Sequence, residues 1–393
     1  FEYNDLGALV KNYQEHDGEK TAATPYVGYN FDTTASGGQF TKGARPTSIR
    51  YPNGRLVHFD YGTSGSMADA MSRIAAIQDD DSGSPGSSLA EYAYLGLGGI
   101  VQVDYPEPDL RYDLAHGTGN DPYAGLDRFD RVVDLLWYNY GTSTDAVRIQ
   151  HGYDRAGNRL WREDPVAAAN SVHFDELYTY DGMYQLTGRQ RGDLGTNHDT
   201  ISSKNFAEAW ALDMTGNWPT FKQDTDGNGT WDLDQSRTHD AANEIAQIAG
   251  SSTHVAHDRA GNMTKTPQPE NWSADYDLTF DAWNRLVKVM DGVTTVATYA
   301  YDGRNFRVTK TASGTTRHFY YSSGWQVLEE RLGTTTDRQN VWGLRYIDDL
   351  VLRDRDADSN SGTGNLGLAG SGLEERLYCL QDANWNVVGI SDS

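Results

Sequence analysis

Short segments of alternating apolar and polar residues, separated by turn-forming residues, dominate the chain. "RLWRED" (159–164) and "RLVKVMD" (285–291) have the period of two that is typical of a strand packed on one face. Gly, Asp, Asn and Ser gather between such segments, as they do in tight turns. The pattern therefore predicts an all-β fold of short strands with little helix.

One segment departs from the strand pattern. In "SMADAMSRIAAI" (66–77), Met67, Met71 and Ile74 fall at helical spacing, and Ser66 precedes them as a potential N-cap. The same letters allow a turn followed by the strand "RIAAIQD" (73–79). Both interpretations stay open at this point.

A single turn motif recurs along the chain. An aromatic or apolar residue is followed by Asp or Asn, a turn, a polar residue and an aliphatic one, as in "YDRAGNRL" (153–160) and "HDRAGNMTK" (257–265). The eleven copies begin at Tyr3, Tyr51, Leu126, Tyr153, Tyr180, Leu212, His239, His257, Phe280, Tyr301 and Gln381. Their spacing varies, which indicates a degenerate repeat with insertions.

Each copy has the chemistry of a β-hairpin. The Asp can accept hydrogen bonds from the backbone amides of the turn, and Gly157 and Gly261 can adopt the positive φ that the turn needs. Because a lone hairpin is barely stable, stacked copies must bury each other's aromatic faces. We therefore predict one quasi-linear all-β body over 1–393, a continuous sheet of stacked hairpins with loop insertions near 78–90, 191–206 and 354–372.

Charge and composition exclude several classes of protein. The 56 acidic and 33 basic residues give a net charge of −23, which repels phosphate backbones, so no nucleic-acid partner is expected. The single cysteine, Cys379, excludes an internal disulfide framework and is expected to be a buried strand thiol. No apolar run approaches the ~18 residues of a membrane helix.

These residues resemble the Rhs/YD-repeat proteins, which include bacterial polymorphic toxins, the shells of insecticidal toxin complexes, and teneurins. The Tyr-Asp copies carry the resemblance over nearly the whole chain. "VWGLRYIDDLVLRDRDAD" (341–358) and "LYCLQDANWNVVGI" (377–390) are similar to the segment before that family's core-associated C-terminal region.

The resemblance implies an exported, extracellular or cell-surface protein. In the family such repeats form a long spiral β-sheet that closes into a hollow shell around the protein's own C-terminal toxin or another cargo, so the resemblance implies a spiral sheet here. The family's self-cleaving C-terminal site has no match here and is not carried over. The start at Phe1 and the modest number of copies predict a piece of a longer chain, as a partial shell or open curved sheet.

The most specific local motif is the acidic loop "DTDGNGTWDLDQ" (224–235). Calcium takes six to eight oxygen ligands from a loop that turns at glycine. The candidate ligands at loop positions one, three, five, seven and nine are Asp224, Asp226, Asn228, Thr230 and Asp232. Gln235 stands where an EF-hand has a bidentate Glu, which predicts weak Ca2+ binding or help from Asp234. The alternative is a solvated Asp/Gly turn.

The remaining motifs give weaker evidence for a binding or catalytic site. "DRDADSNSGTGN" (354–365) repeats the acidic spacing but is interpreted as a Ser/Gly-rich loop. Gly362, Gly364 and Gly367 match G-x-G-x-x-G without a following helix pattern, which argues against a dinucleotide site. Asp348 and Asp349 are expected at a strand end and not as paired glycosidase carboxylates, since adjacent strand residues point to opposite faces.

Two functions fit the sequence. The leading hypothesis is a non-enzymatic structural shell segment that encloses or displays a toxin or other cargo from its own longer chain. The alternative is an adhesion module that binds carbohydrate or cell-surface glycans through aromatic platforms. The repeated placement favours packing between hairpins for Trp161, Trp218, Trp283, Trp325, Trp342 and Trp385. Unpaired terminal strands predict end-to-end self-association.

Overall fold

The all-β prediction is confirmed. The computed structural model describes residues 1–32, 45–119, 121–269, 271–357 and 373–393. Strand makes up 54% of the structure and helix 3%. Nearly every described strand pairs antiparallel with the next strand along the chain, so the fold is a meander, and its turns alternate between two opposite rims.

The first sheet has eighteen strands within the described ranges. They are β1 (Glu2–Tyr3), β2 (Leu9–Tyr13), β3 (Tyr26–Phe31), β4 (Pro46–Arg50), β5 (Leu56–Asp60), β6 (Ala76–Asp81), β7 (Ser84–Leu95), β8 (Gly99–Tyr105), β9 (Leu110–Asp113), β10 (Asp134–Asn139), β11 (Thr144–Tyr153), β12 (Arg159–Glu163), β13 (Asp175–Tyr180), β14 (Leu186–Leu194), β15 (Ile201–Ala211), β16 (Thr220–Asp224), β17 (Leu233–His239) and β18 (Ile245–Ile248).

The second sheet has twelve strands within the described ranges. They are β19 (Ala256–His257), β20 (Met263–Gln268), β21 (Asn271–Phe280), β22 (Leu286–Asp291), β23 (Thr294–Tyr301), β24 (Arg307–Ala312), β25 (Thr315–Tyr321), β26 (Val327–Leu332), β27 (Thr335–Trp342), β28 (Leu350–Arg355), β29 (Glu375–Gln381) and β30 (Val387–Asp392). Where the two sheets meet, His257 lies 3.9 Å from Glu244 in an ion-pair arrangement.

Two single-turn helices interrupt the meander. Helix α1 (Met67–Met71) begins after Ser66, whose hydroxyl accepts a hydrogen bond from the Asp69 amide at 3.2 Å, and β6 follows it. Both interpretations of this segment therefore hold in part. Helix α2 (Pro165–Ala169) begins after Asp164 and was not predicted. Neither helix is long and apolar enough to cross a membrane.

Two of the expected loop insertions are strands instead. Residues 78–90 lie mostly in the β6–β7 hairpin, whose two-residue turn has positive φ at Ser82 and Gly83. Residues 191–206 lie mostly in β14 and β15. These strands were not predicted because their residues are largely polar or Gly. Backbone hydrogen bonds to both neighbouring strands hold them, and such bonds do not require an alternating apolar pattern. Most of the third insertion, 354–372, lies outside the described residues.

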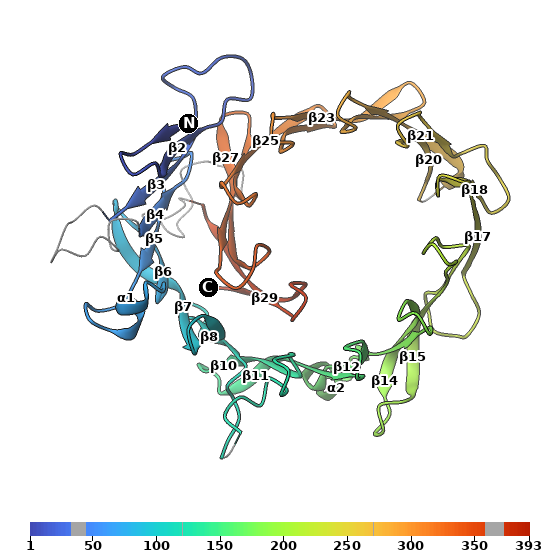
Figure 1. Cartoon of the computed structure of the whole chain (residues 1–393), viewed down its shortest axis with the longest axis horizontal. Helices are drawn as coiled ribbons and strands as arrows, with labels where there is room; N and C mark the ends of the chain where they lie inside the picture. The colour runs from blue at the N-terminus through green and yellow to red at the C-terminus, as the bar shows by residue number, and fades with distance from the viewer. Residues whose placement is uncertain (33–44, 120, 270, 358–372) are drawn as a thin grey trace.

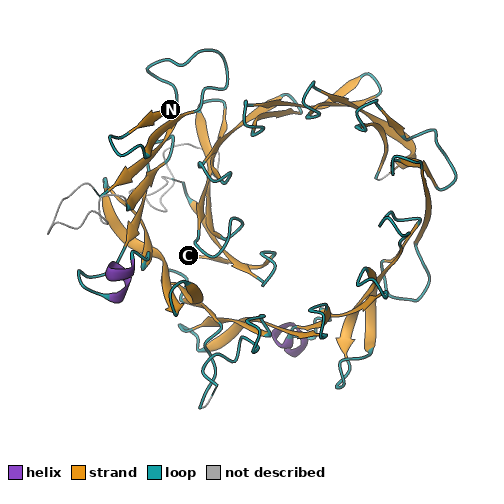
Figure 2. Ribbon diagram, viewed as in Figure 1, coloured by secondary structure: helices purple, strands orange, loops and turns teal. Residues whose placement is uncertain are grey.

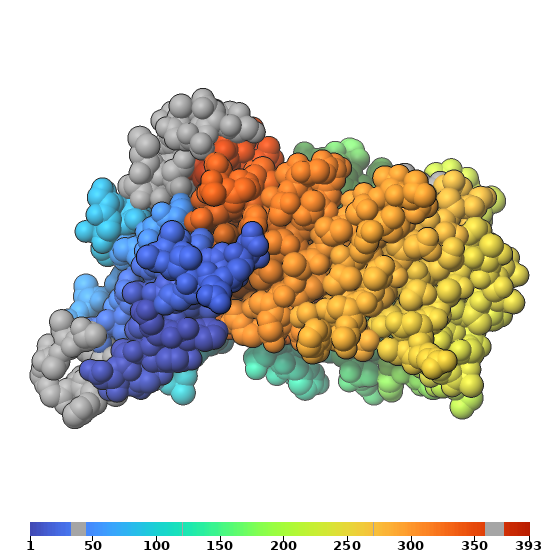
Figure 3. All heavy atoms as spheres, turned by 90° about the horizontal axis from the view of Figure 1, so that it is seen from above, coloured from blue at the N-terminus to red at the C-terminus, as the bar shows by residue number. Residues whose placement is uncertain are grey.

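The strands follow one another around a ring, and the sheet overlaps itself where the ring closes (Figures 1 and 2). The N-terminal strands β2–β8 form the outer layer there, and β25–β29 lie inside them. Seen from above, neighbouring segments of the second sheet lie side by side as tilted rows of the wall (Figure 3). The expectation of an open curved sheet was therefore wrong, because the overlap closes the curve.

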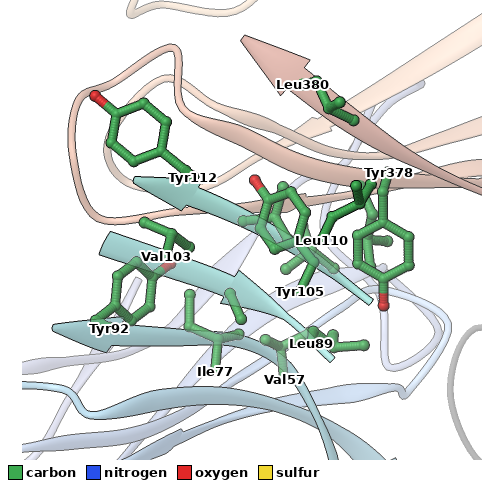
Figure 4. Close-up of a cluster of buried hydrophobic side chains, with 14 of the residues drawn as sticks. Val57, Ile77, Leu89, Tyr92, Val103, Tyr105, Leu110, Tyr112, Tyr378 and Leu380 are labelled. Atoms are coloured by element: carbon green, nitrogen blue, oxygen red, sulfur yellow. The ribbon is translucent and has the colours of Figure 1, made fainter. Parts of the chain in front are cut away.

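The hydrophobic core lies between the two overlapping layers. In Figure 4, Tyr378 of β29 lies beside Tyr105 of β8, and their ring centroids are 5.2 Å apart. The fully buried members of this core come from both layers and include Val27, Ile77, Leu89, Leu135 and Trp137 from the first sheet and Leu328, Val341 and Leu352 from the second. Most of the remaining wall is a single sheet, where few side chains are fully buried.

Candidate functional site in the repeated turns and the seam

The repeated motif folds into one specific turn. In the copy at Tyr153, the Oδ1 atom of Asp154 accepts hydrogen bonds from the backbone amides of Ala156 and Asn158, both at 2.8 Å. Gly157 has a φ of 95°, and Gly261 in the sister copy has a φ of 85°. The predicted Asx-type turn and its positive-φ glycines are confirmed.

All the other copies repeat this geometry except the one at Tyr51, where Pro52 occupies the Asp position and Asn53 accepts from the Arg55 amide at 3.0 Å. The residue at the Asp position accepts from the amides two and four residues later at Asn4, Asp127, Asp181, Asp213, Asp240, Asp258, Asp281, Asp302 and Asp382. Ser322 does the same with its hydroxyl, at 3.1 and 3.3 Å. This copy was missed because the motif was sought with Asp or Asn at that position.

In three copies the leading tyrosine links its hairpin to a preceding strand. The Tyr153 hydroxyl donates to the carbonyl of Val132 at 2.9 Å, and Tyr180 donates to the carbonyl of Arg159 at 2.8 Å. Tyr301 makes the equivalent bond to Leu286. The strand register also shifts at these tyrosines, and such bulges bend a strand and increase its twist. The motif therefore sets the curvature that brings the ends of the sheet together.

The interface between the outer layer (the described residues of 9–139, including β2–β10) and the inner layer (the described residues of 315–392, including β25–β30) is called the seam below. At its centre, two arginines and two aspartates pair across the layers. Arg55, which directly precedes β5, donates to Asp79 at 2.8 Å and to Asp354 at 3.0 Å. Arg376 of β29 donates to the same two carboxylates, at 2.6 and 2.8 Å. All four side chains are buried.

Electrostatics favours the charged forms of Arg55 and Asp79. Burial opposes the charge of Arg55, but Asp354 and Asp79 outweigh it and raise its pKa. Burial likewise opposes the charge of Asp79, but the two arginines outweigh it and lower its pKa. A buried network of this kind is stable only when every member has its partners. The outer and inner layers are therefore held in one register.

Direct hydrogen bonds extend the seam on both sides of this network. The side-chain amide of Gln14 donates to the Tyr321 carbonyl at 2.7 Å and accepts from the Tyr321 amide at 2.9 Å. The Trp137 indole donates to the carbonyl of Gln381 at 3.0 Å, and the Tyr51 hydroxyl donates to a carbonyl of β27 at 2.7 Å. The layers are thus joined by backbone atoms as well as by side chains.

Two histidines meet at the edge of the seam. The Nδ1 atoms of His16 and His318 lie 3.2 Å apart, and the ring of Tyr320 stacks on His16. Burial, followed by the neighbouring His318, lowers the pKa of His16 to about 4, and burial also lowers the pKa of His318. Both rings are therefore neutral at pH 7, and one can donate to the other.

The structure brings together three of the five predicted calcium ligands. One carboxylate oxygen from each of Asp224, Asp226 and Asp232 lies within 4.8 Å of the others. Asn228 is turned toward Asp226, to which its amide group donates at 2.9 Å, and its own Oδ1 accepts from the Thr230 amide at 2.7 Å. The loop joins β16 to β17, so it is a hairpin loop.

The two acidic-loop residues after the cluster have structural partners. Asp234 pairs with Lys222 across the strands at 2.9 Å, so it does not reach the cluster. Gln235 is buried in β17 and accepts from Arg237 at 2.6 Å.

Comparisons with known proteins point to one architecture. No family model and no curated protein matches the sequence. Among solved structures, a Photorhabdus luminescens Tc holotoxin pore matches 98% of this chain with a TM-score of 0.66 and 13% identity. A TcdB2-TccC3 structure without its hypervariable C-terminal region matches 99% with a TM-score of 0.67 and 13% identity. The chain has the fold of a YD-repeat shell.

This chain spans about a fifth of the length of the shell proteins it matches, since it covers 18% and 19% of those two chains. The overlap and the repeated turns are thus elements of this shared fold.

Other predicted residues take structural places in this shell wall. Cys379 is buried in β29, and burial raises the pKa of its thiol to about 11. Asp349 is buried and pairs with Arg345 at 2.6 Å. Gly362, Gly364 and Gly367 and most of 354–365 lie outside the described residues.

All six tryptophans were expected to pack between hairpins, but the structure shows that some of them do not. Trp342 donates to the carbonyl of Val327 at 2.8 Å, and Trp161 stacks on His198 with ring centroids 4.0 Å apart. Trp283 and Trp325, however, are 73% and 66% exposed. Both stand in the repeated turns, where neighbours cover them only in part: Arg285 lies over the Trp283 ring at 5.1 Å, and Phe306 packs edge-on against Trp325 with ring centroids 5.2 Å apart.

Proposed function

We propose that this chain is a non-enzymatic wall segment of an exported YD-repeat shell, and that the complete protein encloses a toxin or other cargo. The observation that carries the proposal is the closure of the ring by the seam. A sheet built only to display a surface would not need a buried ionic network between its first and last strands. The likeness to the Tc toxin structures supports a shell role.

The partner in this proposal is the remainder of the same longer protein. Further repeats would cover the rims of the ring, and the cargo would occupy the interior. The likeness to toxin structures supports an extracellular destination for the complete protein.

Limited proteolysis of the full-length protein tests enclosure. In the wild-type protein we expect the enclosed C-terminal cargo region to resist protease while the wall is intact. Arg55→Met should expose that region and raise its cleavage rate about tenfold or more, because it disrupts the buried network that closes the ring. Lys222→Met removes a half-exposed cation from the single-layer wall and serves as the control.

Equal cleavage of that region in all three proteins would refute enclosure. The adhesion hypothesis predicts a different result, namely glycan-array binding that Trp283→Ala or Trp325→Ala abolishes. Such binding, together with an unprotected C-terminal region, would replace the shell proposal.

A further inference from the structure

The acidic loop between β16 and β17 contains a buried carboxylate oxygen without a partner. Asp224 is 1% exposed, and its Oδ2 accepts from the Gly229 amide at 2.9 Å and lies 3.2 Å from the Lys204 ammonium. Its Oδ1 is buried and has no hydrogen-bond partner among the described residues. A buried acceptor of this kind normally has a water, a donor or a cation beside it.

The loop around Asp224 is already closed by its own hydrogen bonds. The Thr225 amide and hydroxyl both donate to Asp232 Oδ2, at 2.7 and 2.6 Å. Gly227 has a φ of 74°, and a Cβ there would lie 2.0 Å from the Lys204 carbonyl, so the loop rests directly on β15. The carboxylates are therefore held together before any ligand arrives.

We propose that Asp224, Asp226 and Asp232 bind a single Ca2+ ion. Oxygens that bind Ca2+ at ~2.3–2.6 Å can lie at most about 5 Å apart. The 4.8 Å limit on the separation of these three carboxylate oxygens satisfies that condition. Loop carbonyls and water complete the shell, because calcium prefers hard oxygen ligands and accepts irregular geometry. This inference does not depend on the proposed shell function.

We expect the site to bind Ca2+ weakly, in part because of Lys204. Two of the three aspartates are exposed, and the Lys204 ammonium already neutralises Asp224. We expect a dissociation constant of about 10⁻⁴–10⁻³ M, the range of extracellular calcium modules. Bound calcium would fix the loop against β15 and stabilise this stretch of single-layer wall.

Terbium luminescence tests the site directly, since Trp231 lies inside the loop and can sensitise a bound Tb3+ ion. We expect saturable emission that Ca2+ displaces and that millimolar Mg2+ does not. Asp226→Asn should weaken binding about tenfold or more. Asp226 bonds only to Asn228, so this variant should fold normally, which circular dichroism checks.

Asp234→Asn is the matched control, because it removes the same charge from an exposed aspartate outside the cluster. It should leave the affinity nearly unchanged. Lys204→Gln should tighten binding severalfold by freeing Asp224. Emission that is absent, or reduced equally by the two Asp→Asn variants, would reduce the loop to a solvated acidic turn and overturn the proposal. An unchanged affinity in Lys204→Gln would place the ion away from Asp224 and overturn it as well.

Discussion

Replacing Arg55 by Met should open the seam while leaving the rest of the wall intact. The Arg55 side chain is fully buried and donates to Asp79, Asp354 and Gln339 over 2.8–3.3 Å. Methionine matches its apolar stem but removes the guanidinium group. Asp79 and Asp354 then share only Arg376, so a buried negative charge lacks its counter-charge.

The expected loss follows from this imbalance. Removing one partner of a buried ion pair costs about 3–5 kcal/mol, because the remaining charge cannot regain its hydration. Removing Lys222 from its pair with Asp234 should cost about 0–1 kcal/mol, because both side chains are at least a third exposed. Comparing the two single substitutions therefore separates the contribution of the seam to the free energy of unfolding from that of the single-layer wall.

Urea melts of Arg55→Met and Lys222→Met measure the two free energies of unfolding, and small-angle scattering measures the size of each ring. Arg55→Met should enlarge the radius of gyration at low urea while the far-ultraviolet β signal persists. A fourfold variant with Arg55→Met, Asp79→Leu, Asp354→Leu and Arg376→Met should recover much of the loss, since the two buried arginines and the two buried aspartates are removed together. Equal losses below about 1 kcal/mol in both single variants would show that the ionic network does not hold the seam.

Three further outcomes are expected. Gly157→Val should destabilise the protein by about 1–3 kcal/mol, since a β-branched residue resists positive φ. Tyr184 also has a positive φ, which Asn tolerates better, so Tyr184→Asn should stabilise the protein by up to about 1 kcal/mol. Urea melts that rank the two variants otherwise would contradict the turn assignment. Burial, followed by nearby arginines, lowers the pKa of His151 to about 3, and His16 titrates near 4, so stability should fall as pH drops from 6.5 toward 4. His151→Phe should flatten that part of the stability curve, and an unchanged slope would assign it to other groups. Light scattering should show association that increases with salt, because screening of the −23 charge lets unpaired edges such as β30 meet; a strict monomer at every salt concentration would show that these edges are capped.

Most of the local structure could be predicted from the sequence. The Asp154 turn, the positive φ of Gly157 and the strand pattern around them depend on residues within a few positions of each other, so their chemistry can be recognised from the letters. The Ser66 cap of α1 is local in the same way. The acidic loop was also found from spacing, because its carboxylates belong to one hairpin.

Tertiary structure decided the closure of the ring and the identity of its core. Arg55 and Arg376 are more than three hundred residues apart in sequence, and neither has a local pattern that marks it as buried. Their pairing exists only because small bends at each repeated tyrosine accumulate over the whole sheet until its last strands lie inside its first. The exposure of Trp283 also depends on the tertiary structure, because a turn tip is covered only if another part of the protein reaches it. A sequence pattern fixes how each hairpin bends, but the sum of those bends determines which distant residues meet.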